Sequence, residues 1–297
     1  MPVCVASPVA GLILWAASLG AAHAEVSADL AQRLLQQSGS AAFLAEVSPT
    51  VQAYLMAAVD AAPQASVKRA HLLPLSQALQ KAYAPERLRG QVVLTLARQL
   101  SPQDAGAGQA WWDSPLGLQV AELERLRASS ADTSGARMAA GLRELGRMSP
   151  SRRALLADVV DASGSSSLHT ELLIQGLQAI HRGTAGFLPQ AAKVSLKDLK
   201  SRLEAQRSEL TEAHRSAAMG LGAQDYAALS DAQLQSYLDW LRSPAGAHWH
   251  QAMLLAVTQA LKGATEEAQR TVEVGATAVP KGMSVLPGQA GVPRSSP

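Results

Sequence analysis

Cysteine is nearly absent from this chain of 297 residues, which contains only Cys4. Cys4 lies in an N-terminal stretch that we expect to be removed, so the mature chain is predicted to carry no thiol. This excludes disulfides, cysteine nucleophiles and thiolate metal sites from the mature protein. A chain without thiols also suits an oxidising compartment.

Aromatic residues are the second scarcity, at 4% of the chain, and valine and isoleucine are sparse beside alanine and leucine. Strands favour β-branched and aromatic side chains, whereas alanine and leucine favour helices. Leu196, Leu199 and Leu203 follow one another at helical spacing, which agrees with this preference. The sequence therefore predicts an all-α fold.

An excess of one charge is lacking as well. The 26 Lys and Arg residues oppose 24 Asp and Glu residues, which leaves a formal net charge of +2. A nucleic-acid-binding protein usually concentrates its basic residues on one face, and no basic run occurs in this sequence. We therefore expect no nucleic-acid partner.

Motifs for catalysis or cofactor binding are missing too. The sequence has no Gly-x-Ser-x-Gly elbow, no glycine-rich phosphate loop and no two histidines four residues apart. The histidines of the His248-Trp249-His250 run point in divergent directions on a helix, so they do not share a metal there. We predict no metal and no cofactor, and favour a protein that is not an enzyme.

The N-terminus has the pattern of an export signal. Residues 9–22 are uncharged and mostly apolar, and Ala22-x-Ala24 follows as a cleavage site. The stretch is short for a membrane span, which needs about 20 apolar residues. We predict a signal peptide over residues 1–24, cleavage after Ala24, a periplasmic location and no integral span afterwards. Because residues 1–8 lack Lys and Arg, an uncleaved N-terminal anchor is the alternative.

An internal repeat divides the mature chain. Residues 100–117 align without a gap with residues 229–246, and both stretches start with Leu-Ser, share a tryptophan and end in Ser-Pro-x-Gly. Residues 34–39 match residues 159–164 in the same order along the chain. This predicts a duplication into two related helical modules in tandem. The expected ranges are 25–148 for a degenerate first module, 149–270 for the second, and 271–297 for a disordered tail.

The Ser-Pro-x-Gly motif predicts a helix break followed by a new helix. Its serine caps free backbone amides, its proline suits the first helical position, and its glycine lets another backbone approach. The residues of the two motifs are Ser114, Pro115 and Gly117, and Ser243, Pro244 and Gly246.

Tryptophans gather at these motifs. Trp111, Trp112, Trp240 and Trp249 all lie in or near them. One interpretation is that they anchor the core of each helical corner, since an indole buries a large area. The other is an exposed aromatic rim for a peptide, a lipid or a glycan.

The second motif also carries a resemblance to a known family. The run from Tyr237 to Gly246, with an upstream apolar helix that includes Val159 and Val160 and ends at Gly164, resembles the exported bacterial family catalogued as domain of unknown function 2059. The resemblance is clearer over residues 150–262 than over 30–125. It implies a small helical envelope protein in two tandem copies, without an established activity and without catalytic residues.

Three functional hypotheses follow. The favoured one is a periplasmic, non-enzymatic protein that binds an envelope protein or peptide in a helical groove at the second corner. Its edge would be formed by Trp240, Arg242, His248 and Trp249. The first alternative is an envelope hydrolase that uses Asp239, His248 or His214 as acid and base. The second is a purely structural envelope component.

Overall fold

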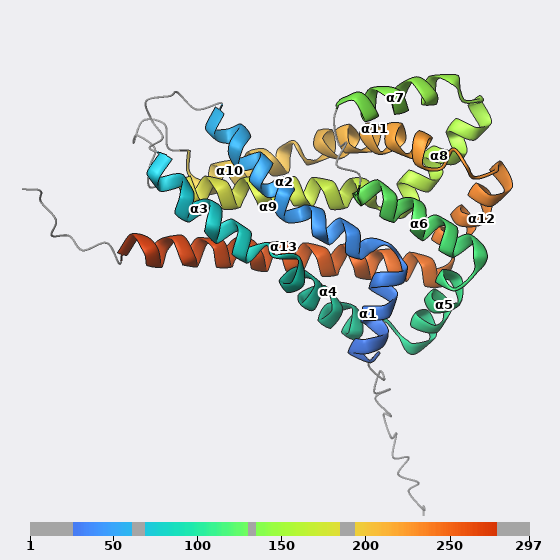
Figure 1. The fold of residues 1–297 in the computed structure, drawn as a ribbon, viewed down its shortest axis with the longest axis horizontal. Helices are drawn as coiled ribbons and strands as arrows, with labels where there is room; N and C mark the ends of the chain where they lie inside the picture. The colour runs from blue at the N-terminus through green and yellow to red at the C-terminus, as the bar shows by residue number, and fades with distance from the viewer. Residues whose placement is uncertain (1–25, 61–68, 130–134, 185–193, 278–297) are drawn as a thin grey trace, which may run out of the picture.

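Helices make up nearly all of the described chain. The computed structural model describes residues 26–60, 69–129, 135–184 and 194–277, and within these ranges it contains no strand (Figure 1). The all-α fold predicted from the composition is thus confirmed. The predicted signal peptide lies outside the described residues.

Two sets of helices follow each other, with α7 (Gly135–Arg147) between them. The first set is α1 (Ala28–Gln37), α2 (Ser40–Asp60), α3 (Arg69–Ala82), α4 (Pro85–Gln99), α5 (Pro102–Trp112) and α6 (Pro115–Ser129). The second set is α8 (Pro150–Ser163), α9 (Ser165–Thr184), α10 (Leu196–Ala205), α11 (Arg207–Asp225), α12 (Asp231–Arg242) and α13 (Pro244–Thr277).

A left-handed glycine ends the first helix of each set. Gly39 has a φ of 73° and Gly164 a φ of 66°, a conformation that other residues rarely adopt. The serine before each glycine donates a hydrogen bond to the carbonyl three residues earlier, at 3.2 Å for Ser38 and 2.9 Å for Ser163. The same local contacts therefore turn the chain from α1 into α2 and from α8 into α9.

The two Ser-Pro-x-Gly segments also form matching corners. The hydroxyl oxygen of Ser114 accepts a hydrogen bond from the amide of Gly117, and that of Ser243 from the amide of Gly246, both at 3.0 Å. A Cβ atom on Gly117 would lie 2.1 Å from a backbone carbonyl oxygen, and one on Gly246 would lie 2.0 Å from the equivalent oxygen. Only glycine fits this close approach.

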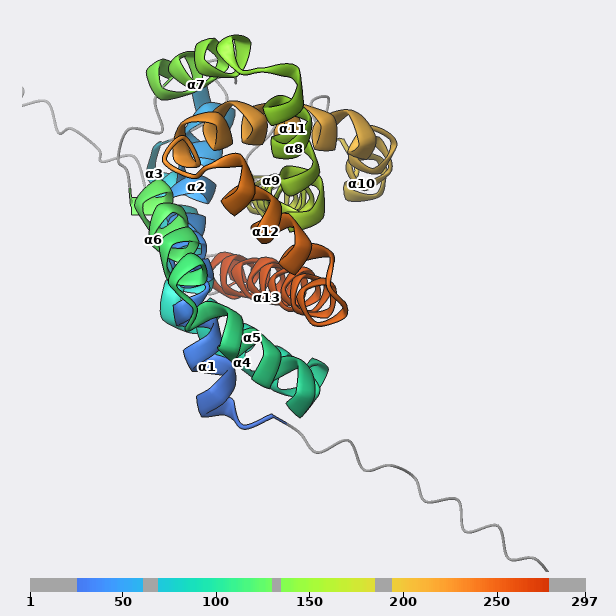
Figure 2. The ribbon, with the colours of Figure 1, turned by 90° about the vertical axis from the view of Figure 1, so that its right-hand side faces the viewer.

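The two sets share one core. The last helix of the second set, α13, packs against α3, α4 and α5 of the first set, besides α9 and α12 of its own (Figure 2). In the same way α6 packs against α11 and α12 as well as against α2 and α5. The buried apolar side chains of both sets form a single cluster. Each set thus completes its core with a helix of the other.

The helix α13 extends further than the sequence predicts. It continues to Thr277, so the expected disordered tail is wrong for residues 271–277, and the rest of that tail lies outside the described residues. After Pro244 the next proline is Pro280, so no proline interrupts the helix over this range.

In the described part of the chain, α2 is the helix that is long and apolar enough to cross a membrane. A core helix of a globular protein passes the same test. Leu44, Val47, Val51 and Leu55 form its buried face, and α2 packs against α1, α3, α4, α6 and α9. Here the helix serves as part of the shared core.

Candidate binding cleft

The predicted aromatic edge is part of the core. Trp240 and Trp249 are only 8% and 2% exposed, so they do not form a surface for a ligand, and this part of the prediction is wrong. Trp240 stacks on Trp111 of the other set at 5.3 Å between ring centroids, with the rings 10° apart. Trp112 lies edge-on to Trp240. The physical reason is that the tryptophans of the two corners pack on each other.

Arg242 and His248, the other two residues of the expected edge, are exposed but do not lie on one surface feature. The guanidinium of Arg242 pairs with Asp158 at 3.2 Å, and Nδ1 of His248 lies 3.3 Å from a carboxylate oxygen of Asp104. Asp158 belongs to α8 and Asp104 to α5, so each side chain faces a different helix.

The three residues of the hydrolase hypothesis have separate partners. Asp239 accepts a hydrogen bond from Gln235 at 2.8 Å, His248 faces Asp104, and Nδ1 of His214 lies 2.8 Å from the hydroxyl of Thr170. Within the described residues no interaction joins Asp239, His248 and His214. The structure therefore does not bring this acid-base set together.

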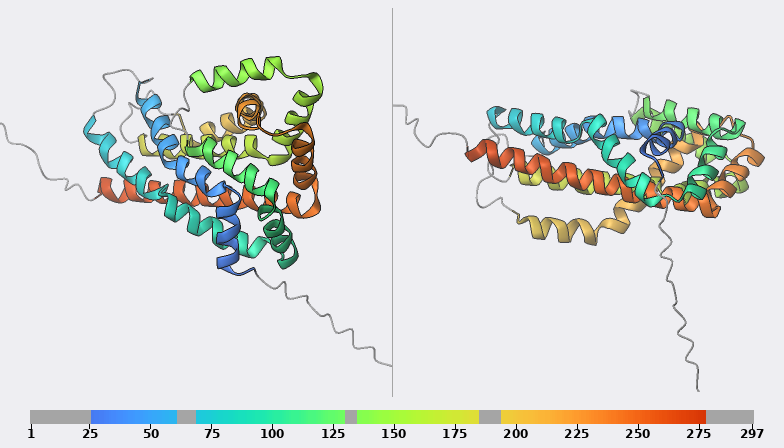
Figure 3. Two further views of the ribbon diagram at one scale, coloured as in Figure 1. Left: turned by 45° about the vertical axis from the view of Figure 1, so that its right-hand side comes forward. Right: turned by 90° about the horizontal axis from the view of Figure 1, so that it is seen from below.

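A polar cleft lies elsewhere, between α9, α10, the start of α11 and α13. It has a volume of about 680 Å³. On α9 the lining residues Glu171, Gln175, Gln178 and Arg182 recur every three or four positions, so they form one stripe of the helix. Figure 3 shows α10 at the edge of the molecule, where it packs against α9 and α11 and forms the outer wall.

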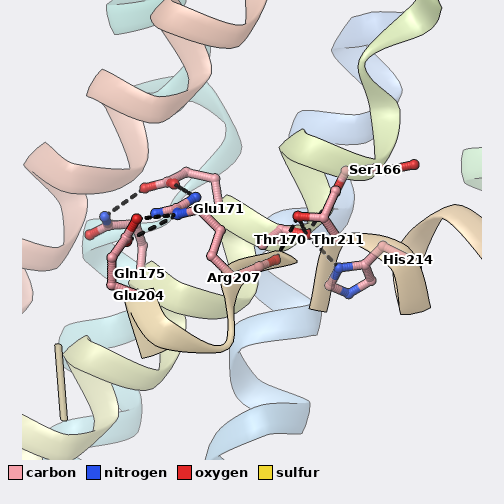
Figure 4. Close-up of polar contacts among 8 residues, drawn as sticks. All are labelled: Ser166, Thr170, Glu171, Gln175, Glu204, Arg207, Thr211 and His214. Carbon is pink, nitrogen blue, oxygen red and sulfur yellow. Dashed lines mark hydrogen bonds and ion pairs between the residues drawn. The ribbon is translucent and has the colours of Figure 1, made fainter. Parts of the chain in front are cut away.

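One wall of the cleft is a closed ion-pair network, drawn in Figure 4. Arg207 donates to Glu171 at 3.1 Å and to both carboxylate oxygens of Glu204 at 3.0 Å, while Gln175 donates to Glu171 at 2.7 Å. Burial alone lowers the pKa of Arg207, but the hydrogen bonds to the two glutamates outweigh it and raise that pKa. Both oxygens of Glu171 have partners, so the carboxylate is held in place rather than free to act as a base.

A second hydrogen-bonded group continues from this wall along α9 and α11 (Figure 4). Thr170 is fully buried, and its hydroxyl contacts His214 Nδ1 at 2.8 Å and the hydroxyl of Thr211 at 3.2 Å. Burial lowers the pKa of His214, which favours the neutral imidazole. The group therefore joins the two helices as a neutral contact.

The opposite side of the cleft contains two largely buried glutamines. Gln178 and Gln269 are 9% and 7% exposed, and within the described residues neither side chain has a hydrogen bond. Beside them Thr265 is fixed, because its hydroxyl lies 2.6 Å from that of Tyr83 and donates to the carbonyl of Gln175 at 3.3 Å. The amide atoms of both glutamines are open to the cleft, where solvent or a ligand can pair with them.

Charged side chains without ion pairs within the described residues line the same cleft. Arg182, Lys200 and Lys262 line the cleft, and none of them has an ion pair among the described residues. The Nε of Arg182 is buried and makes no hydrogen bond there. Glu266 also lines the cleft, and the described part of the chain offers it no ion pair either. Unpaired charge in the cleft is thus mostly positive.

The sequence contains one signal for this site. Arg182 and Gln178 follow Gln175 and Glu171 on a helix that also carries the buried apolar residues Leu172 and Ile174. A polar stripe on a helix usually faces solvent. Here it faces α10 and α13, and only the tertiary arrangement reveals this.

Among the described residues, no group of three or more His, Cys, Asp or Glu side chains is arranged to hold a metal ion. Comparison of the chain with protein-family models, with curated proteins and with solved structures finds no match. The candidate site therefore depends on the geometry of this chain alone.

Proposed function

We propose that this protein is a non-enzymatic binding protein that takes a polar ligand in the cleft between α9, α10 and α13. The observation that carries the proposal is the pair of amides of Gln178 and Gln269, which make no hydrogen bond within the described residues and are open to the cleft, beside the buried, unpaired Nε of Arg182. The donors and acceptors of these amides are available to a ligand.

The volume of the cleft agrees with a ligand site. Its volume of about 680 Å³ falls within the range of roughly 300–1,000 Å³ that is common for ligand pockets. The network of Arg207, Glu171 and Gln175 fixes one wall before any ligand arrives. Preorganised polar groups lose little entropy on binding, which favours affinity.

Binding fits the geometry better than the two alternatives. A hydrolase needs a free base near its nucleophile, whereas Glu171 has both oxygens engaged and Asp239, His248 and His214 face separate partners. A purely structural component would fill the space between its helices with its own side chains. The unpaired amides in an open cleft argue against that.

The predicted duplication remains a proposal, and matched contacts support it. Gln233 donates to Gln119 at 3.0 Å across α12 and α6, while His248 lies 3.3 Å from Asp104 across α13 and α5. Asp104 and Gln119 precede Gln233 and His248, respectively, by 129 positions, the spacing of the repeat. Equivalent positions of the repeat are therefore in contact twice. In one contact the first position belongs to the first set, and in the other it belongs to the second set.

On this proposal only the second set has a binding cleft. At the spacing of 125 set by Gly39 and Gly164, the counterparts of Gln178 and Arg182 are Ala53 and Ala57. The helix α13 has 34 residues where α6 has 15, and Lys262, Thr265 and Gln269 lie on the added part. The first set therefore lacks the equivalent residues, and the specialisation belongs to one half.

We place this binding protein in the periplasm, on the basis of the predicted signal peptide and the lack of thiols after it. The resemblance to domain of unknown function 2059 is in keeping with this location and stays a prediction.

The test is a thermal-shift screen with short peptides, sugars, nucleotides and organic acids, each at millimolar concentration. A ligand of the cleft should raise the melting temperature of the wild type but not of the double variant Gln178→Leu, Gln269→Leu. Gly90→Ala, at an exposed helical site with open space around it, is the matched control and should behave as the wild type. If no class stabilises the wild type over the double variant, the proposal is wrong.

A further inference from the structure

The direction of the helices places the unpaired groups at one end of the cleft. α9 and α13 lie side by side and run the same way (Figure 1), and Thr265 on α13 contacts the carbonyl of Gln175 on α9. Gln178 and Gln269 come about one turn further along their helices, so they lie at the same level of the cleft. Arg182 follows Gln178 by one more turn.

The outer wall brings a second cation to the cleft. Arg207 meets Glu171, and the later residues Thr211 and His214 meet the earlier residue Thr170, so this wall runs opposite to α9. Lys200 lies on α10, which packs against α9, and it lines the same cleft as Gln178 and Arg182.

The charges in the cleft select an anion. Arg182 and Lys200 have no ion pair within the described chain, in contrast to Arg207, whose charge is matched by Glu171 and Glu204. Glu266 lines the same cleft with the opposite charge, but Lys262 on the same helix balances it in number. Guanidinium and ammonium groups bind carboxylates through charge-assisted hydrogen bonds, which are the strongest that side chains make.

The amides beside the cations indicate what adjoins this anion. A glutamine side chain has one acceptor and two donors, so it can pair with the C=O and the N–H of a peptide group. We propose that the ligand is a peptide with a free C-terminal carboxylate. Arg182 and Lys200 bind the carboxylate, and Gln178 and Gln269 pair with the peptide group next to it. This inference rests on the proposed function of the cleft.

The experiment compares tetra-alanine with a free C-terminus, the same peptide as its C-terminal amide, and inorganic phosphate. Binding to the full chain is measured by isothermal titration calorimetry. Alanine side chains are small and uncharged, so the comparison isolates the contribution of the C-terminal carboxylate to binding. We expect the free acid to bind at least tenfold more tightly than the amide and than phosphate.

The variant Arg182→Gln, Lys200→Gln should abolish this preference, while the double variant Gln178→Leu, Gln269→Leu should weaken both peptides. Arg33→Gln, which removes an exposed cation on α1, is the matched control and should retain the preference. Circular dichroism checks that each variant is folded.

The outcomes separate the two proposals. Equal binding of acid and amide would overturn the carboxylate inference and leave the binding cleft standing. Phosphate binding as tightly as the free acid would show a site for any anion and would also overturn the inference. If neither peptide binds and the thermal-shift screen finds no other ligand, both the binding function of the cleft and the carboxylate inference are wrong.

Discussion

At the scale of single residues, the buried polar side chains fall into two groups. Thr170, Glu171 and Thr265 are held by hydrogen bonds to named partners. Gln178 and Gln269 are also largely buried, but their amide atoms are open to the cleft and make no hydrogen bond within the described residues. The first group stabilises the fold, whereas the second leaves donors and acceptors available to a ligand.

Replacing either cleft amide by an apolar group should change stability little. We expect Gln178→Leu or Gln269→Leu to change the free energy of unfolding by less than about 0.5 kcal/mol, because the amide atoms are open to the cleft and lose no hydrogen bond within the described residues. Glu171→Leu should instead lower it by about 2 kcal/mol, since Gln175 and Arg207 lose a charged partner. Urea unfolding measures both. A loss of stability in both glutamine variants would contradict this account of the cleft.

His250 should make stability depend on pH. Burial lowers its pKa and outweighs the opposing effects of its hydrogen bond to the Gly246 carbonyl and of the Glu124 charge. In the unfolded chain the pKa is about 6.5. Between the folded and unfolded values the unfolded state binds more protons, so the contribution of His250 is complete above pH 6.5 and is lost as the pH falls through the lower, folded pKa.

The measurement is the free energy of urea unfolding between pH 7 and pH 5. The wild type should lose stability over this interval, by about 1.4 kcal/mol for each unit by which the pKa is lowered. His250→Asn should lose less, because the group that titrates is gone. An equal loss in both proteins would assign the effect to other groups, such as His214, whose pKa is also lowered by burial.

At the scale of elements, the corners are the most constrained parts of the chain. At Gly117 and Gly246 a side chain would collide with a carbonyl oxygen of the preceding helix, which is backbone and has little freedom to move. The serine of each corner meanwhile satisfies an amide at the start of the next helix. Each corner thus fixes the angle between two helices.

Alanine at either corner glycine should therefore destabilise strongly. We expect Gly117→Ala and Gly246→Ala each to lower the free energy of unfolding by about 3 kcal/mol, since the backbone must move to admit the new atom. Gly106→Ala provides the control within α5, where a Cβ meets nothing within 4 Å. That change should raise stability by about 0.5–1 kcal/mol, because alanine favours the helix. Similar effects at all three positions in urea unfolding would refute the close approach.

At the scale of the whole molecule, α6 and α13 each pack against helices of the other set and so hold the two sets together. Trp111 of the first set stacks on both Tyr237 and Trp240 of the second. Glu124 on α6 accepts hydrogen bonds from the hydroxyls of Tyr226 and Tyr237 at 2.9 and 2.8 Å. These contacts bury aromatic area and polar groups together at one interface, so neither set would keep its core without the other.

A cut between the two sets should leave them associated. A protease site inserted between Ser129 and Gly135 would divide the chain after α6, yet α13 would still pack against α3, α4 and α5. The two fragments should elute together on size-exclusion chromatography in native buffer and separate only in denaturant. Separation in native buffer would contradict the shared core.

Part of this architecture could be predicted from the sequence because it depends on local chemistry. The abundance of alanine and leucine and the scarcity of β-branched and aromatic residues favour helices over strands. Serine, proline and glycine at fixed offsets mark the corners at Ser114 and Ser243, because capping and close approach act within a few residues. The end of α13 is not predictable in this way, because composition alone indicates a tail over residues 271–277, where the structure has a helix.

The tertiary structure decided what no local pattern contains. It buried Trp240 and Trp249, for which the sequence left a core role and a surface role open, and it stacked Trp240 on Trp111 of the other half of the chain. It also turned the stripe from Glu171 to Arg182 away from solvent and toward α10 and α13. Whether a polar helix face meets water or a neighbouring helix depends on contacts between residues far apart in sequence, and these exist only once the chain has folded.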